Sequence, residues 1–208
     1  MSVVGLQRWG KLCESVGAGQ DAPACFHRLT AAYSEPHRHY HNLRHIAECQ
    51  NEFDAVRDRL VSPAAIELAI WFHDAVYDTK ASDNEEKSAE WAREFLSAAD
   101  VEDSIVQQVS NLILATKHHD TRLDPGAPAL VDIDLSILGQ PERRFWEYET
   151  QIRAEYAWVD PALFSQKRAE ILEAFLKRAR IYSTDWFFKR YERPARQNLQ
   201  ASIERLRA

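Results

Sequence analysis

The chain has 208 residues, 45% of them hydrophobic, and a formal net charge of −6. This length suits one domain with a substantial buried core, and the acidic balance argues against a nucleic-acid polymer as the main partner. Three cysteines without close spacing are typical of reduced thiols, no apolar run is long enough to span a membrane, and no secretory leader follows Met1, so we expect a cytoplasmic protein.

Apolar residues recur at helical spacing along most of the chain, and glycine is rare. The expected helices cover about residues 6–16, 22–33, 40–60, 63 through 74, 84 through 96, 102–119, 141–158, 161–180 and 183–206. Pro194 could break the last of these helices, and residues 120–128 are expected to form a loop. We therefore predict one all-α helical bundle over residues 1–208.

His73 and Asp74 stand side by side in an apolar stretch that is expected to be helical. Burying two such side chains costs free energy unless a cation or a hydrogen-bond partner satisfies them. A divalent metal ion is the obvious candidate. Consecutive helical residues point about 100° apart, so the pair can share one ion only if other segments complete the coordination shell.

The remaining ligands are sought among histidines and carboxylates in similar surroundings. His41 and His45 are four residues apart on the helix expected from about Tyr40, so they would share one face. One of them can bind the ion while the other faces what the ion binds. Asp134 lies in a second short apolar run, at residues 131–138. Two imidazoles with two carboxylates suit Mn, Zn, Fe or Ni, and leave room for Mg nearby.

The order His45, His73-Asp74, Asp134 resembles the HD superfamily of metal-dependent phosphohydrolases, which are all-helical domains named for that adjacent pair. Residues 40–45, Tyr-His-Asn-Leu-Arg-His, resemble a signature of cyclic-nucleotide phosphodiesterases. In that signature the second histidine is a metal ligand and the first gives a proton to the leaving group. The resemblance implies a single HD-type bundle, with a metal-site core at about 37–140 and C-terminal helices at about 141–208.

Three further segments carry the same resemblance. Residues 133–136 are similar to the segment that holds the last phosphodiesterase ligand, and residues 113–116 resemble a helix end whose threonine, here Thr116, holds a metal-bound water. Residues 73–79 are also similar to the motif of alarmone hydrolases, although Tyr77 stands where those enzymes carry glutamate. The family implied is the bacterial branch of predicted HD phosphohydrolases, and the substrate does not follow from it.

The site residues could carry out a metal-assisted hydrolysis in the following roles. His45, His73, Asp74 and Asp134 would bind the metal ion, and Asp74 could bridge to a second ion. His41 would protonate the leaving oxygen, and Asp78, expected one helical turn after Asp74, would orient the attacking water. Arg44 and Lys117 are the candidate cations for the phosphate, and Thr116 and Glu86 could hold water molecules. His118 and His119 are expected to border the substrate pocket.

Several of these assignments compete with plainer ones. Asp78 and Glu86 could equally be exposed carboxylates on a helix surface, and for Arg44 and Lys117 a solvated face is the stronger alternative. His118 and His119 could simply cap the end of their helix. The aromatic cluster of Trp186, Phe187, Phe188 and Tyr191 suits a core or a homodimer surface better than a ligand box.

The expected function is hydrolysis of a phosphate ester, a nucleotide or another small phosphorylated metabolite, by metal-activated water. One alternative is an HD-type di-iron oxygenase, which needs two irons and further histidine ligands such as His118 and His119. Another is a non-catalytic, metal-stabilised sensing domain. Metal content, oxygen consumption and hydrolysis of simple phosphate esters separate the three.

Overall fold

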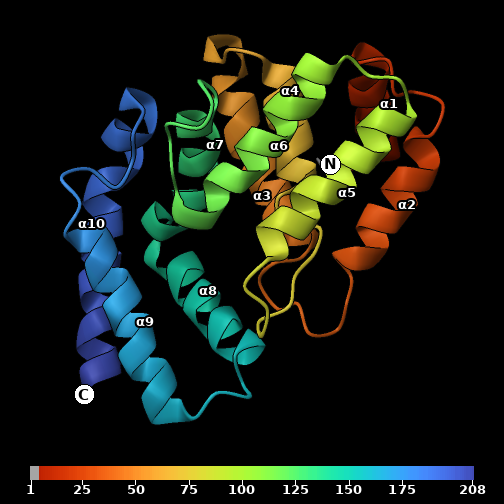
Figure 1. Cartoon of the computed structure of the whole chain (residues 1–208). Coiled ribbons are helices and arrows are strands. Elements are labelled where there is room, and N and C mark those ends of the chain that lie inside the picture. Colours follow the sequence, from red (N-terminus) through yellow and green to blue (C-terminus); the bar gives the residue numbers. More distant parts are fainter. Residues whose placement is uncertain (1–4) are drawn as a thin grey trace. The chain divides into compact units, whose positions relative to one another are not determined.

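The computed structural model describes residues 5–208 and contains ten α-helices and two 3₁₀-helices, with no strand in that range (Figure 1). This confirms the all-α prediction. The α-helices are α1 (Leu6–Ser15), α2 (Ala22–Ala32), α3 (Leu43–Val56), α4 (Pro63–Phe72), α5 (Asn84–Ala98), α6 (Asp103–His118), α7 (Ala127–Asp134), α8 (Glu142–Glu155), α9 (Pro161–Leu176) and α10 (Asp185–Arg207). The 3₁₀-helices are η1 (Arg57–Arg59) and η2 (Leu135–Gly139). None of the helices described has the length and apolar character to cross a membrane.

The chain divides into two compact units, Met1–Val131 and Asp132–Ala208, and the division falls inside α7. The first unit holds α1 to α6, and the second holds η2 and α8 to α10. That residues 1–208 form one domain therefore stays a prediction.

The first unit is built around α4, whose residues are apolar on nearly every side. A helix that is apolar all round is stable only when neighbours cover it, and here α1, α3, α5 and α6 all pack against it. Trp71 and Phe72 near its end are fully buried against Trp9 and Phe95. The end of α4, where the His73-Asp74 pair follows, is therefore held in a rigid aromatic core.

The second unit packs α10 against α9 and η2. Gly139 ends η2 directly on α10, where a Cβ atom would come within 2.6 Å of Tyr191 Cβ, so only glycine fits. Of the aromatic cluster expected as core or dimer surface, Phe187 and Tyr191 are buried and pack against the ring of Tyr182. Those two residues thus belong to the core of this unit.

Two helix ends differ from expectation in ways that matter for the site. α3 begins only at Leu43, because the Asn42 side chain caps it by accepting from Arg44 N–H at 2.9 Å. His41 precedes the cap, so the prediction that it shares a helical face with His45 is wrong. α4 ends at Phe72, so the pair follows the helix instead of lying inside it.

Three smaller corrections concern the later helices. α6 ends at His118, because His119 adopts a left-handed conformation with φ of 53° that closes the helix. α7 begins at Ala127, inside the stretch expected to be a loop. α10 runs unbroken through Pro194, since buried residues on both sides, such as Tyr191 and Leu199, keep it packed.

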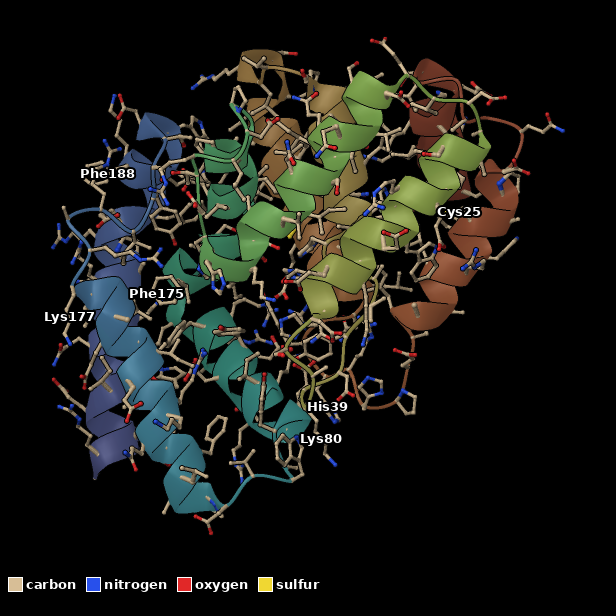
Figure 2. All side chains as sticks on the ribbon, in the orientation of Figure 1. Cys25, His39, Lys80, Phe175, Lys177 and Phe188 are labelled. Carbon is tan, nitrogen blue, oxygen red and sulfur yellow. The ribbon has the colours of Figure 1, made fainter. Side chains whose placement is uncertain are left out.

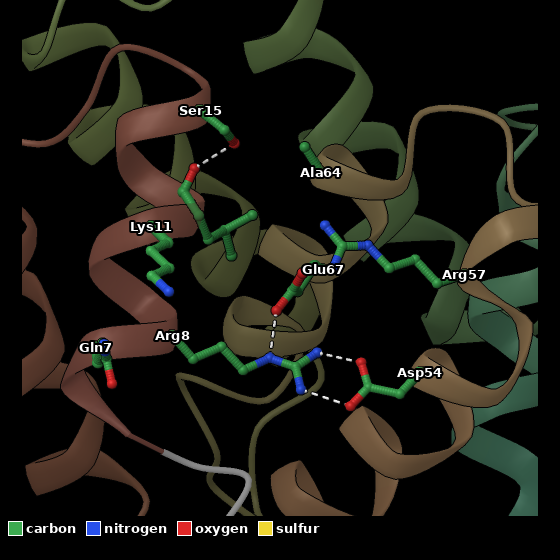
Figure 3. Close-up of a pocket in the computed structure, with 9 residues that line it drawn as sticks. Gln7, Arg8, Lys11, Ser15, Asp54, Arg57, Ala64 and Glu67 are labelled. Carbon is green, nitrogen blue, oxygen red and sulfur yellow. Dashed lines mark hydrogen bonds and ion pairs between the residues drawn. The ribbon is translucent and has the colours of Figure 1, made fainter.

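A pocket of about 470 Å³ lies in the first unit between α1, α3, η1 and α4 (Figure 3). At its side Arg8 donates one hydrogen bond to the buried Glu67 at 2.6 Å and two to Asp54 at 2.7 and 2.8 Å. This triad satisfies a carboxylate inside the apolar α4 and ties α1 to α3 and α4. None of the site residues predicted from the sequence lines this pocket.

Candidate metal centre

Three of the four predicted ligands, His45, His73 and Asp74, converge in the first unit. His45 Nε2 lies 3.1 Å from His73 Nε2, and Asp74 Oδ2 lies 3.0 Å from His73 Nε2 and 3.6 Å from His45 Nε2. Metal bonds of roughly 2.1 Å place neighbouring ligand atoms about 3.0 to 3.4 Å apart. The two imidazoles are buried, while 19% of the Asp74 side chain is exposed. The group could hold a metal ion that is open to solvent on one side.

A hydrogen bond at the end of α4 determines which ring nitrogen of His73 carries the proton, and this makes Nε2 the nitrogen that could bind a metal ion. The last carbonyls of a helix have no N–H partner within it. His73 Nδ1 donates to the carbonyl of Ile70 at 3.0 Å, and the Tyr33 hydroxyl donates to the carbonyl of Trp71 at 3.0 Å. Because Nδ1 carries the proton, Nε2 of a neutral His73 presents its lone pair to Asp74.

A neutral His73 and an ionised Asp74 therefore point two acceptors at each other over 3.0 Å. Such an arrangement needs a positive charge between the two groups, either a proton on the imidazole or a metal ion. Burial by itself raises the pKa of the Asp74 carboxyl, but the charge and hydrogen bond of His73, together with His41 and His45, bring that pKa well below its usual range. The site is therefore built for a carboxylate beside a cation.

His41 adjoins this group from the turn before α3. Its ring lies 5.8 Å from that of His45 and stacks on Tyr77 with a centroid distance of 4.3 Å. It is half-buried and is not among the three converging ligand atoms. Its role as a proton donor stays a prediction, with a position beside the centre that suits it.

Cys49 is a neighbour of the centre that the sequence reading missed. Its sulfur lies 3.7 Å from both ring nitrogens of His45, and the residue is buried. The spacing of four residues on α3 could have revealed it, because such residues share a helical face. Its thiol is a soft potential ligand.

Asp78 and Asp134 are the two remaining predicted aspartates. Asp78 is exposed in the loop after the pair, where its Oδ1 accepts the Lys80 N–H at 2.9 Å and its own N–H is bound by Asn84 (Figure 2 labels Lys80). It is not one helical turn beyond Asp74, because α4 has already ended, and that placement was wrong. Asp134 is the last residue of α7 and belongs to the second unit, so its part as a ligand stays a prediction.

The predicted phosphate-binding cations are paired with carboxylates. Lys117 donates to Glu86 and, at 2.6 Å, to the carbonyl of Ser82. The hydrogen bond between Lys117 and Glu86 raises the pKa of Lys117 and lowers the pKa of Glu86. Arg44 donates to Glu48 one turn along α3 at 3.1 Å. The structure thus favours the surface alternative for Lys117, Glu86 and Arg44.

The remaining predicted residues lie at the end of α6. The Thr116 hydroxyl donates to the carbonyl of Ile113 in its own helix at 2.7 Å. His118 is exposed, and His119 caps the helix. Because α6 ends at His118, His119 lies outside the helix that carries Thr116.

Comparisons of the chain with protein-family models, with curated proteins and with solved structures gave no match.

Proposed function

We propose that this chain is an HD-type, metal-dependent hydrolase of a phosphate ester, acting on a nucleotide or another small phosphorylated metabolite. The observation that carries the proposal is the convergence of His45 Nε2, His73 Nε2 and Asp74 Oδ2, with the His73 lone pair facing a carboxylate. When bound there, a divalent ion such as Mn, Zn, Fe, Ni or Mg would polarise a phosphoryl oxygen and lower the pKa of a water. The motif order, with its likeness to the HD superfamily, supports the same assignment.

The chain's own residues would then divide the work. Burial holds the rings of His45 and His73 in place, and Asp74 supplies the negative charge that retains a dication. His41 donates a proton to the leaving oxygen, and its stacking on Tyr77 keeps the ring directed beside the group. Because the chain carries a net charge of −6, attraction of a phosphate ester depends on the metal ion and local residues.

A substrate panel tests this proposal. Protein loaded with Mn²⁺ would be incubated with nucleoside phosphates, cyclic nucleotides and nitrophenyl phosphates, with products followed by chromatography. We expect hydrolysis of at least one class, lost on chelation and in Asp74→Asn. An Asp54→Asn variant, altered in the pocket at α1, is the matched control and should retain turnover.

The outcomes separate the alternatives. A fully loaded protein that hydrolyses no member of the panel would contradict the proposal and favour the sensing domain. Two irons per chain with oxygen consumption would favour the di-iron oxygenase. That alternative needs ligands such as His118, which is exposed at the end of α6.

A further inference from the structure

Arg38, in the segment between α2 and α3, is buried and joins three backbone positions around the centre. Its Nη1 donates to the carbonyls of Asp74 at 2.6 Å and His41 at 3.2 Å, and its Nη2 donates to the carbonyl of Ala75 at 3.0 Å. Its Nε donates to a Glu35 carboxylate oxygen at 2.9 Å. One planar group therefore connects the turn of the expected proton donor to the turn of the metal-binding carboxylate.

Two aromatic rings restrict the plane of this guanidinium. Its Cζ lies 5.1 Å from the ring centroid of Tyr33 and 5.4 Å from that of Tyr77. Tyr33 is bound to the end of α4 through the carbonyl of Trp71, and Tyr77 stacks on His41. The two tyrosines thus connect the guanidinium to the end of α4 and to His41. A shift of the guanidinium would therefore move groups on both sides of the centre.

We infer that Arg38 is a positioning residue that holds the carbonyls of Asp74 and His41 at a fixed separation, an inference that rests on the metal centre of the proposed function. His41 and Asp74 both lie in irregular turns outside the helices, so no helical hydrogen-bond ladder sets their spacing. Lysine cannot replace the arginine, because an ammonium group lacks the planar set of donors and the stacking surface.

Arg38→Lys tests the inference while keeping the charge. Metal-free protein would be titrated with Co²⁺ and followed by visible absorption, at a temperature where circular dichroism shows each variant fully folded. We expect the Kd for Co²⁺ to rise by about tenfold or more, the usual effect of losing a group that orients a metal ligand. The absorption band should shift as well, because Asp74 is less well held.

Arg28→Lys is the matched control, since Arg28 lies in the same unit and also stacks on an aromatic ring, 4.8 Å from the Trp91 centroid. Its Co²⁺ affinity should stay within about twofold of the unaltered protein, as expected for a residue that orients no ligand. In Arg38→Ala, added guanidinium should restore part of the lost affinity, whereas ammonium at the same ionic strength should not.

These outcomes separate the inference from the proposed function. Unaltered protein that shows no Co²⁺ absorption band would contradict the metal centre itself. If the unaltered protein binds Co²⁺ and Arg38→Lys binds it with the same Kd and spectrum, the centre stands and the positioning role is overturned. If Arg38→Lys lowers the thermal stability but leaves the Co²⁺ affinity unchanged, Arg38 supports the fold and does not position the metal ligands.

Discussion

Both units bury ionisable side chains, and the two differ in what those side chains face. In the second unit Glu192 accepts from the N–H groups of Ile181 and Tyr182 and from Arg196, at 2.8 to 3.2 Å. In the first unit the lone pair of His73 faces the carboxylate of Asp74. Donors meet acceptors at Glu192, whereas at His73 and Asp74 a proton on the imidazole or a metal ion must lie between two acceptors. Burial of charge therefore does not mark a functional site by itself, whereas the balance of donors and acceptors does.

The comparison predicts that Glu192 acts on stability alone. Glu192→Ala would leave the buried N–H groups of Ile181 and Tyr182 without their acceptor, while Arg196 keeps its bonds to backbone carbonyls, so the free energy of unfolding should fall by about 2 to 4 kcal/mol. Glu173→Ala, which removes a more exposed partner of Arg207, should cost less than about 1 kcal/mol. Urea unfolding measures both. Equal losses in the two variants would show that satisfied burial is not what distinguishes Glu192.

His41→Ala should affect chemistry without affecting the fold. We expect kcat to fall by about a hundredfold, the usual loss for a general acid, with metal content unchanged. The loss should shrink for nitrophenyl substrates, whose leaving groups need little protonation. His39→Ala, in the same loop, should leave kcat unaltered. If good and poor leaving groups lose rate equally, His41 is not the acid.

The pH dependence of stability tests the same comparison at Asp132. It is buried, and its two oxygens accept from Ser183 and Thr184 N–H at 2.8 and 2.7 Å, just before α10 begins. Burial raises the pKa of its carboxyl to about 6, although the two N–H bonds act to lower it. A raised pKa means that the folded state holds the proton more tightly, so the contribution to stability falls as pH rises through 6.

The measurement is urea unfolding of the protein and of Asp132→Asn at pH 5 and pH 7.5. The stability of the unaltered protein relative to the variant should drop by about 1 kcal/mol between these pH values. The variant does not titrate there, so it corrects for the other groups. A difference that stays constant, or that grows with pH, would show that the N–H bonds outweigh burial at this position.

The smallest effect is expected at the end of α6. Replacing both His118 and His119 by alanine should preserve the bound metal and raise KM severalfold, on the order of 1 kcal/mol. His27→Ala, an exposed histidine on α2, should change neither quantity. Loss of metal from the double variant would instead make these histidines ligands and bring the di-iron alternative forward.

Periodicity was enough to predict the helices, and the resemblance to HD-domain motifs singled out His45, His73 and Asp74 as members of the candidate centre. They failed where side chains capture backbone groups. Asn42 caps α3 and so removes His41 from the helix, a feature that the Asn-Leu-Arg sequence could have indicated. Arg38 could not have been found this way, because its carbonyl partners at Asp74 and Ala75 lie 36 and 37 residues further along the chain.

The helix ends show the same limit. The end of α4 depends on Tyr33 and on the ring of His73, which bind its last carbonyls. A pattern of apolar spacing contains no information about such side-chain donors, so it extended the helix through Asp74. The Lys117–Glu86 pair was missed for a related reason, since it joins two helices across 31 positions of sequence.

Metal analysis of protein purified without chelator tests the central claim most directly. After reconstitution with Mn, Zn, Fe, Ni or Mg and removal of excess, the unaltered protein should retain at least one ion per chain. Asp74→Ala should retain none, because it removes the one carboxylate that converges with His45 and His73 in the first unit, while its circular dichroism stays helical. Full metal content in Asp74→Ala, or none in either protein, would contradict the account.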